Sequence, residues 1–181
     1  MRRYFRWFLI IGIVLAGCLP VRAVQPDSTK QASTFFLKTL EGDSFFLSHY
    51  VGEEAKPRLK QPVVLSFFAT WCVPCRAEIP VLHTLQQEFP DTKFLLVNVN
   101  EKQDLVARYK EKMEITLPIL MDIYGIVAEK YRVIDEKNLA RLPAMVIINE
   151  DGQQVYFHRG YEKGDEEQVR EILSKLVQSN R

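Results

Sequence analysis

The hydrophobic pattern of this chain changes repeatedly between continuous apolar runs and apolar residues at helical spacing. Two nearly continuous runs, at residues 62–68 and 93–99, predict buried strands, and shorter apolar runs at 119–121 and 145–148 predict two more strands. After the first run, apolar residues recur at steps of three and four positions: Ile79, Leu82, Leu85 and Phe89. This spacing predicts a helix with one buried stripe. Strands that alternate with helices favour parallel pairing, so the pattern indicates an α/β fold.

Turn and capping signals add the remaining elements. Two hairpins are predicted, one joining 35–37 to 44–47 and one joining 145–148 to 154–161. The second helix is expected to be capped by Asn100 with Gln103 and to bury Leu105, Tyr109 and Met113. A short helix is expected over 123–131. Asp165 is predicted to cap a final helix, whose buried face is Val169, Ile172, Leu173, Leu176 and Val177.

The N-terminus has the pattern of an export signal. Three arginines within the first six residues precede an uncharged run at 7–21, which is too short to cross a bilayer easily. The run leads into Leu15-Ala16-Gly17-Cys18, which resembles a bacterial lipobox and implies cleavage before Cys18 and lipidation of its thiol. Two alternatives stay open: cleavage after Ala23, which discards Cys18, or an uncleaved anchor. Residues 1–23 are therefore predicted to be a leader, 24–33 a polar tether and 34–181 one domain.

Charge and cysteine usage narrow the chemistry. A net charge of +1 over 181 residues, without a basic stripe, argues against nucleic-acid binding. Outside the leader only Cys72 and Cys75 remain, and cysteines three positions apart do not staple distant parts of a fold. A zinc site would need two more ligands, and the histidines lack ligand spacing; they are His49, His83 and His158. The pair is therefore interpreted as redox-active, with no metal and no cofactor expected.

The position of Cys72 between a strand and a helix suits a reactive thiolate. The positive end of the helix and its N–H groups stabilise the thiolate and lower the thiol pKa. Trp71 is expected to cover one side of the sulfur, and Pro74 to restrict the loop. Cys72 is expected to be the exposed nucleophile. Cys75, one turn deeper, is expected to resolve the mixed disulfide.

The segment from Phe67 to Pro80, with its Trp-Cys-Val-Pro-Cys core, resembles the active-site segment of the TlpA/ResA branch of the thioredoxin superfamily. The resemblance extends over about residues 34–178. It implies a thioredoxin-like fold with a central mixed sheet flanked by helices, an N-terminal β-hairpin and a central strand–helix insertion. It also implies a cis peptide bond at Pro143, facing the redox pair beside a groove for an extended client segment. Glu78 would lie below the pair and move protons, whereas Ser66 replaces the acid or asparagine of other relatives.

Two departures from the family pattern concern the partner. The charged stretch 134–141 lengthens the approach to Pro143, and Ala144 stands where a threonine is common. The resemblance implies a reductant outside the cytoplasm that receives electrons from a membrane thiol donor. Its clients would be disulfide-bearing proteins, such as apocytochromes c or oxidase subunits with copper-site cysteines. Three alternatives are a disulfide-introducing oxidant, a peroxide-reducing enzyme and a non-catalytic module that binds extended chains.

Overall fold

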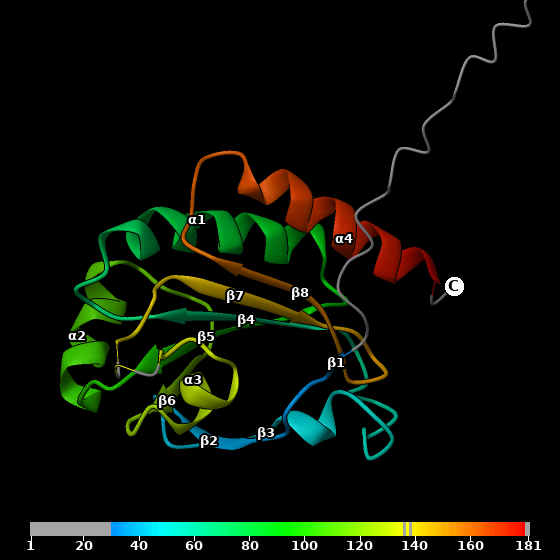
Figure 1. The fold of residues 1–181 in the computed structure, drawn as a ribbon, viewed down its shortest axis with the longest axis horizontal. Coiled ribbons are helices and arrows are strands. Elements are labelled where there is room, and N and C mark those ends of the chain that lie inside the picture. Colours follow the sequence, from blue (N-terminus) through cyan, green and yellow to red (C-terminus); the bar gives the residue numbers. More distant parts are fainter. Residues whose placement is uncertain (1–29, 136, 138, 180–181) are drawn as a thin grey trace, which may run out of the picture.

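The computed structural model describes residues 30–135, 137 and 139–179, and these residues form one mixed sheet with helices on both faces (Figure 1). The strands are β1 Lys30–Gln31, β2 Phe36–Thr39, β3 Ser44–Phe46, β4 Val63–Phe68, β5 Lys93–Val99, β6 Ile119–Asp122, β7 Ala144–Ile148 and β8 Gln153–Arg159. Their order in the sheet is β1-β8-β7-β4-β5-β6-β2-β3. The helices are α1 Val73–Glu88, α2 Gln103–Lys112, α3 Ile126–Lys130 and α4 Asp165–Ser179, with a 3-10 turn η1 at Leu47–His49.

The sheet topology brings several chain segments to one edge. Strands β4, β5 and β6 are parallel, so their carboxyl ends lie at the same edge. Strand β7 runs antiparallel to β4, which places its first residue at that edge as well. The hairpin of β2 and β3 extends the sheet beyond β6. The predicted mixed sheet, the hairpin and the thioredoxin-like layering are therefore confirmed.

Two hydrophobic cores lie on the two faces of the sheet. The first joins the sheet to α1, α2 and α4 through residues such as Ile79, Val106 and Leu173. The second joins it to α3, η1 and the segment before β2, through residues such as Leu47 and Val127. Figure 1 shows α1 and α4 side by side along one face, with α3 on the other. Burial of all six residues of β4 follows from this double cover.

Helix α2 differs from its prediction. The cap position is Lys102, with no side-chain cap, while Asn100 has a φ of 58° and Gln103 donates instead to the carbonyl of Leu40 at 2.6 Å. Leu105 is 41% exposed, and the buried face contains Val106 and Tyr109. The predicted cap and the placing of Leu105 were therefore wrong. A three- and four-residue pattern in a short segment fits two neighbouring faces, and packing against the sheet selects one of them.

The boundaries of two other segments differ from those predicted from the sequence. The helix expected over 123–131 is α3, from 126 to 130, because Ile123 and Tyr124 form an exposed turn ahead of it. The end of the predicted tether pairs with the sheet, since Lys30 and Gln31 lie opposite Gln154 and Gln153 of β8. Their side chains are exposed, so backbone pairing alone makes this a strand.

The predicted leader, including Cys18, lies outside the described residues. Among residues 30–135, 137 and 139–179, no helix is long and apolar enough to cross a membrane.

Candidate functional site

The redox pair lies where β4 passes into α1. After Phe68 the chain makes a tight turn, in which the N–H of Cys72 donates to the carbonyl of Ala69 at 3.1 Å. Cys72 is the N-cap of α1, and its Sγ accepts a hydrogen bond from the N–H of Cys75 at 3.3 Å. The two cysteines form a disulfide, with their Cα atoms 5.4 Å apart. In the reduced form, the same N–H and the helix dipole would stabilise a Cys72 thiolate.

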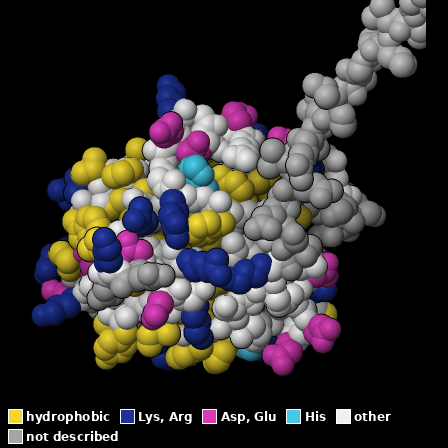
Figure 2. Space-filling view, viewed as in Figure 1, with side chains coloured by type: hydrophobic (Ala, Val, Ile, Leu, Met, Phe, Trp, Pro, Cys, Tyr) yellow, Lys and Arg dark blue, Asp and Glu magenta, His cyan; other side chains and the backbone are white. Residues whose placement is uncertain are grey.

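Access to the two sulfurs differs only slightly. Cys72 is 3% exposed and Cys75 is fully buried, so Cys72 is the outer member without being openly exposed in the disulfide form. The adjacent apolar side chains are far more open, with Trp71 62% and Val73 70% exposed. The space-filling view shows apolar side chains gathered among Lys and Arg at the left end of the molecule (Figure 2), where the parallel strands end. A partner that reaches Cys72 would therefore contact apolar surface first.

Pro143 lies beside this site. The Leu142–Pro143 peptide bond is cis, as the resemblance implied, and Pro143 is buried immediately before β7. Ala144 pairs with Phe67, which brings Pro143 to the end of β4, where the turn to Cys72 begins. The carbonyl of Pro143 accepts from the N–H of Gly160 at 2.8 Å.

Glu78 lies one turn of α1 beyond Cys75 and is only 2% exposed. The hydroxyl of Ser66 donates to its Oε2 at 2.6 Å. Burial raises the pKa of Glu78 to about 7, an effect that the Ser66 hydrogen bond opposes and the negative charge of Asp165 reinforces. The structure thus places a carboxyl group that gains and loses a proton near neutral pH within one helical turn of the inner cysteine.

A second buried acid, Glu101, was missed in the sequence. Its Oε2 accepts from the N–H of Thr70 and from Nδ2 of Asn98, both at 2.7 Å, and its Oε1 accepts from the hydroxyl of Thr70 at 2.6 Å. Arg76 also donates to the carbonyl of Thr70 at 3.2 Å. These bonds hold the turn before Cys72 against the end of β5. The signal available was an asparagine inside an apolar strand with an acid three positions later.

The charged stretch before Pro143 forms a small closed loop. An isolated bridge joins Ile134 to Ala140, and Asp135 Oδ1 accepts from the N–H groups of Lys137 and Leu139, each at 3.0 Å. Asp135 also pairs with Arg141 at 3.3 Å. The exposed side chain of Leu139 lies in this loop. That the loop borders a client groove stays a prediction.

The three histidines do not converge. His49 contacts the ring of Phe46, Nε2 of His83 accepts from the N–H of Thr116 at 3.4 Å, and His158 pairs with Asp165. Within the described part of the chain, no group of three His, Cys, Asp or Glu residues could hold a metal ion. The chemistry that this site offers is that of a disulfide at the start of a helix, which can exchange with another thiol pair.

Comparisons with known proteins agree with this chemistry. Residues 29–156 match the AhpC/TSA family. Thiol-disulfide oxidoreductase ResA of Halalkalibacterium halodurans is 31% identical over 150 residues, which cover 82% of this chain and 76% of that protein. The thioredoxin-like protein YneN of Bacillus subtilis is 35% identical over 136 residues, covering 72% and 71% of the two chains.

A solved structure shares the fold. It is that of the exposed lipoprotein thioredoxin Etrx1 of Streptococcus pneumoniae, with a TM-score of 0.64 and 24% identity over 80% of this chain and all of that one. Together with the disulfide at the start of α1, these similarities establish the reaction class. The chain belongs to the AhpC/TSA family, in the TlpA/ResA-like branch of thioredoxin-fold thiol–disulfide oxidoreductases.

Proposed function

We propose that this protein reduces disulfides of client proteins outside the cytoplasm, through Cys72 and Cys75. The observation that carries the proposal is the Cys72–Cys75 disulfide at the N-terminal end of α1, beside Pro143. Reduction is favoured over oxidation because the segment between β5 and β7 holds, in its described residues, only β6 and the short helices α2 and α3. Oxidants of this fold usually carry a larger helical insertion there.

The reaction proceeds by two exchanges. The Cys72 thiolate attacks a client disulfide, so a bond forms between Cys72 Sγ and one client sulfur while the other client sulfur leaves as a thiolate. Cys75 then loses its proton and attacks Cys72 Sγ, which releases the second client thiolate and forms the intramolecular disulfide. Two electrons pass from the protein dithiol to the client, and the client thiolates take up two protons. A thiol donor must then reduce Cys72–Cys75 again.

Glu78 is the proposed acceptor for the Cys75 proton. The neutral hydroxyl of Ser66 is too weak a base to take this proton. The Glu78 carboxyl, in contrast, has a pKa of about 7. The carboxylate can take the proton as the Cys75 thiolate forms. Glu78→Gln should therefore slow the second exchange and leave the first unchanged, which stopped-flow mixing with a small disulfide can resolve.

The midpoint potential of the Cys72–Cys75 couple tests the direction. The purified full chain is equilibrated with thiol buffers, quenched and alkylated, so that the reduced fraction is counted at each ratio. A value near or below about −230 mV supports a reductant that needs a dedicated donor, whereas a value near about −120 mV would make the protein an oxidant. Rapid peroxide turnover by the reduced chain would instead favour a peroxidase.

The clients and the donor are tested by trapping. Cys75→Ser leaves Cys72 able to form a mixed disulfide that cannot be resolved, and Cys72→Ser serves as the matched control. The proposed clients carry CxxCH segments of apocytochromes c or copper-site cysteines, and the proposed donor is a membrane thiol protein. Full function of the Cys72→Ser/Cys75→Ser double variant in cells would instead support the non-catalytic binding module.

We further propose that the chain is exported and attached to a membrane through a lipid on Cys18. The leader pattern supports this, and the similar solved structure of Etrx1 is described as an exposed lipoprotein. Labelling of cells with a fatty acid should mark the protein, and Cys18→Ser should abolish the label. A label-free protein that begins after Ala23 would show ordinary cleavage, whereas an intact N-terminus would show an uncleaved anchor.

A further inference from the structure

The role proposed for Glu78 raises the question of how its proton reaches water. Glu78 is 2% exposed, and within the described residues it receives one hydrogen bond, from Ser66. Each oxidation of the cysteine pair would leave a proton on this carboxyl, and the carboxyl can return to equilibrium with the medium before the next step only if that proton reaches solvent. The route by which this proton leaves matters only if Glu78 has the role proposed above, so it rests on the proposed function.

Glu78 lines a small cavity between α1, β7, β8 and α4. The space open to the centre of a water molecule is about 10 Å³, enough for roughly one water. Much of the wall is aliphatic and comes from α1 and α4. The polar groups that share the cavity with Glu78 are Tyr156, His158, Tyr161, Asp165 and Glu166.

Two partly exposed side chains among the cavity lining, His158 and Asp165, contact each other. His158 Nε2 lies 3.4 Å from Asp165 Oδ2, and the two side chains are 38% and 30% exposed. The N–H of Glu162 donates to the same Asp165 oxygen at 2.7 Å, which fixes this carboxylate at the start of α4. His158 therefore stands between the buried cavity and bulk water, in an orientation that Asp165 holds.

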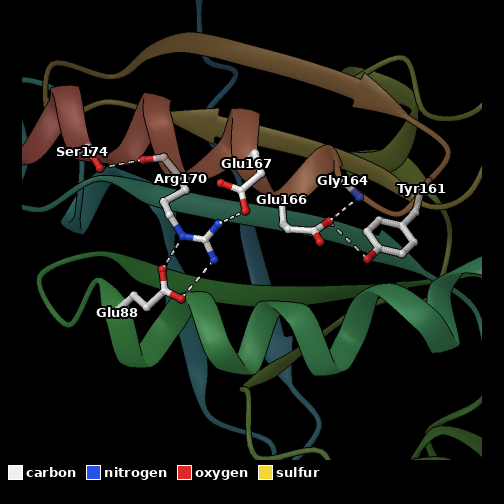
Figure 3. Close-up of polar contacts among 7 residues, drawn as sticks. All are labelled: Glu88, Tyr161, Gly164, Glu166, Glu167, Arg170 and Ser174. Carbon is white, nitrogen blue, oxygen red and sulfur yellow. Dashed lines mark hydrogen bonds and ion pairs between the residues drawn. The ribbon is translucent and has the colours of Figure 1, made fainter.

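The other polar groups around the cavity have different partners. Glu166 accepts from the N–H of Gly164 at 2.9 Å and from the hydroxyl of Tyr161 at 3.4 Å (Figure 3). Hydrogen bonds from its own backbone N–H and from the N–H of Gly164 lower the pKa of Glu166. Burial raises the pKa of Tyr161 and also that of Tyr156, the latter to about 12. These three groups therefore each keep one protonation state near neutral pH. His158 is the imidazole among the described residues that line the cavity, and an imidazole has two ring nitrogens that can accept and donate hydrogen bonds.

We propose that Glu78 exchanges its proton with solvent through this cavity, by way of one water molecule and His158, with Asp165 as the positioning residue. The proton taken from the Cys75 thiol passes from Glu78 to the cavity water, then to His158 and to solvent. No electron moves in these steps, and the reverse path returns a proton when the disulfide is reduced. The route runs between α1, β7, β8 and α4, and Trp71 is not among the residues that line it.

The test compares the kinetics of the reduced full chain with oxidised glutathione between pH 5.5 and 8.5, followed by tryptophan fluorescence in a stopped-flow instrument. His158→Ala should slow the second exchange by roughly tenfold, and added imidazole should restore it. His49→Ala, on the opposite face of the sheet, should show neither effect. Asp165→Asn should lower the pH at which the rate of the second exchange is half-maximal, because the Asp165 charge helps to raise the pKa of Glu78.

Glu78→Gln separates the two hypotheses. If Glu78→Gln slows the second exchange but His158→Ala reacts like wild type at every pH, the route is wrong and the role of Glu78 stands. If Glu78→Gln itself reacts like wild type, the proposed role of Glu78 fails and the route fails with it. An equal midpoint potential for His158→Ala and wild type would show that the variant alters the rate and leaves the folded redox site intact.

Discussion

Glu101 provides the sharpest test of how the turn before Cys72 is held. Its side chain is 9% exposed and accepts three hydrogen bonds of 2.6–2.7 Å from Thr70 and Asn98. Hydrogen bonds to charged groups contribute about 1.5–3 kcal/mol each, and unpaired buried donors carry a further cost. Because these bonds share one carboxylate, their contributions do not add fully. We expect Glu101→Ala to lower the free energy of unfolding by about 3 kcal/mol.

Glu101→Gln is the matched variant, because it keeps the shape and removes the charge. The glutamine oxygen can occupy the place of Oε2 and accept from the Thr70 N–H and from Asn98. Its NH₂ group then occupies the place of Oε1 and donates to the Thr70 hydroxyl, which rotates to accept. All three contacts survive as neutral hydrogen bonds, so we expect a loss of only about 1 kcal/mol.

Urea unfolding of the oxidised chain, followed by circular dichroism, measures both losses. Glu111→Ala, an exposed position in α2, controls for the change of residue type and should lie within about 0.5 kcal/mol of wild type. Equal losses for Glu101→Ala and Glu101→Gln would refute the reasoning, since the charge and not the satisfaction of the donors would then decide. A loss below about 0.5 kcal/mol in Glu101→Ala would show that the network does not stabilise the fold.

Three other positions each link one contact to a measurable change. Glu78 has a pKa of about 7 in the folded chain, against an ordinary 4.5, so the free energy of unfolding should fall by about 3 kcal/mol as the pH rises from 4.5 to 7. Urea unfolding at pH 4.5 and 8 should show this component in wild type but not in Glu78→Gln. Gly125→Ala, with a φ of 68° and a new methyl 2.7 Å from two side-chain atoms, should lower Tm more than Gly160→Ala, which has a φ of 85° and open space; equal shifts in calorimetry would leave only backbone strain. Tyr131→Phe should lower the free energy of unfolding by about 1 kcal/mol and speed proteolysis near β1. The reason is that the Tyr131 hydroxyl donates to the backbone carbonyl of Ser33, between β1 and β2, at 2.8 Å.

The redox pair and the main strands could be predicted because their signals are local. A continuous apolar run gives β4, and the cysteines at its end need no distant residue to be recognised. The meeting of Cys72 with Pro143 was implied by the family resemblance, and the antiparallel register of β7 with β4 accounts for it. These features depend on patterns that tertiary packing reinforces.

The features that the sequence did not reveal depend on distant contacts. Strand β1 has exposed polar side chains and no apolar alternation, so only its pairing with β8 defines it. Leu105 and Val106 are both apolar neighbours in α2, and only the sheet surface decides which is buried. Glu101 lies in a polar stretch between β5 and α2. Its structural role depends on hydrogen-bond donors at Thr70, 31 positions earlier in the chain.

The two buried acids of the site differ in their donors, and this difference assigns them different tasks. Glu101 accepts three hydrogen bonds, so its oxygens are committed to holding the turn, whereas Glu78 receives one within the described residues and faces a cavity. Because the two networks share no residue, their effects on stability should add to within about 0.5 kcal/mol in the Glu78→Gln/Glu101→Gln double variant. Glu101→Gln alone should keep the pH dependence that Glu78→Gln removes. Strong coupling between the two changes would mean that the turn before Cys72 and the proton acceptor below Cys75 act as one unit.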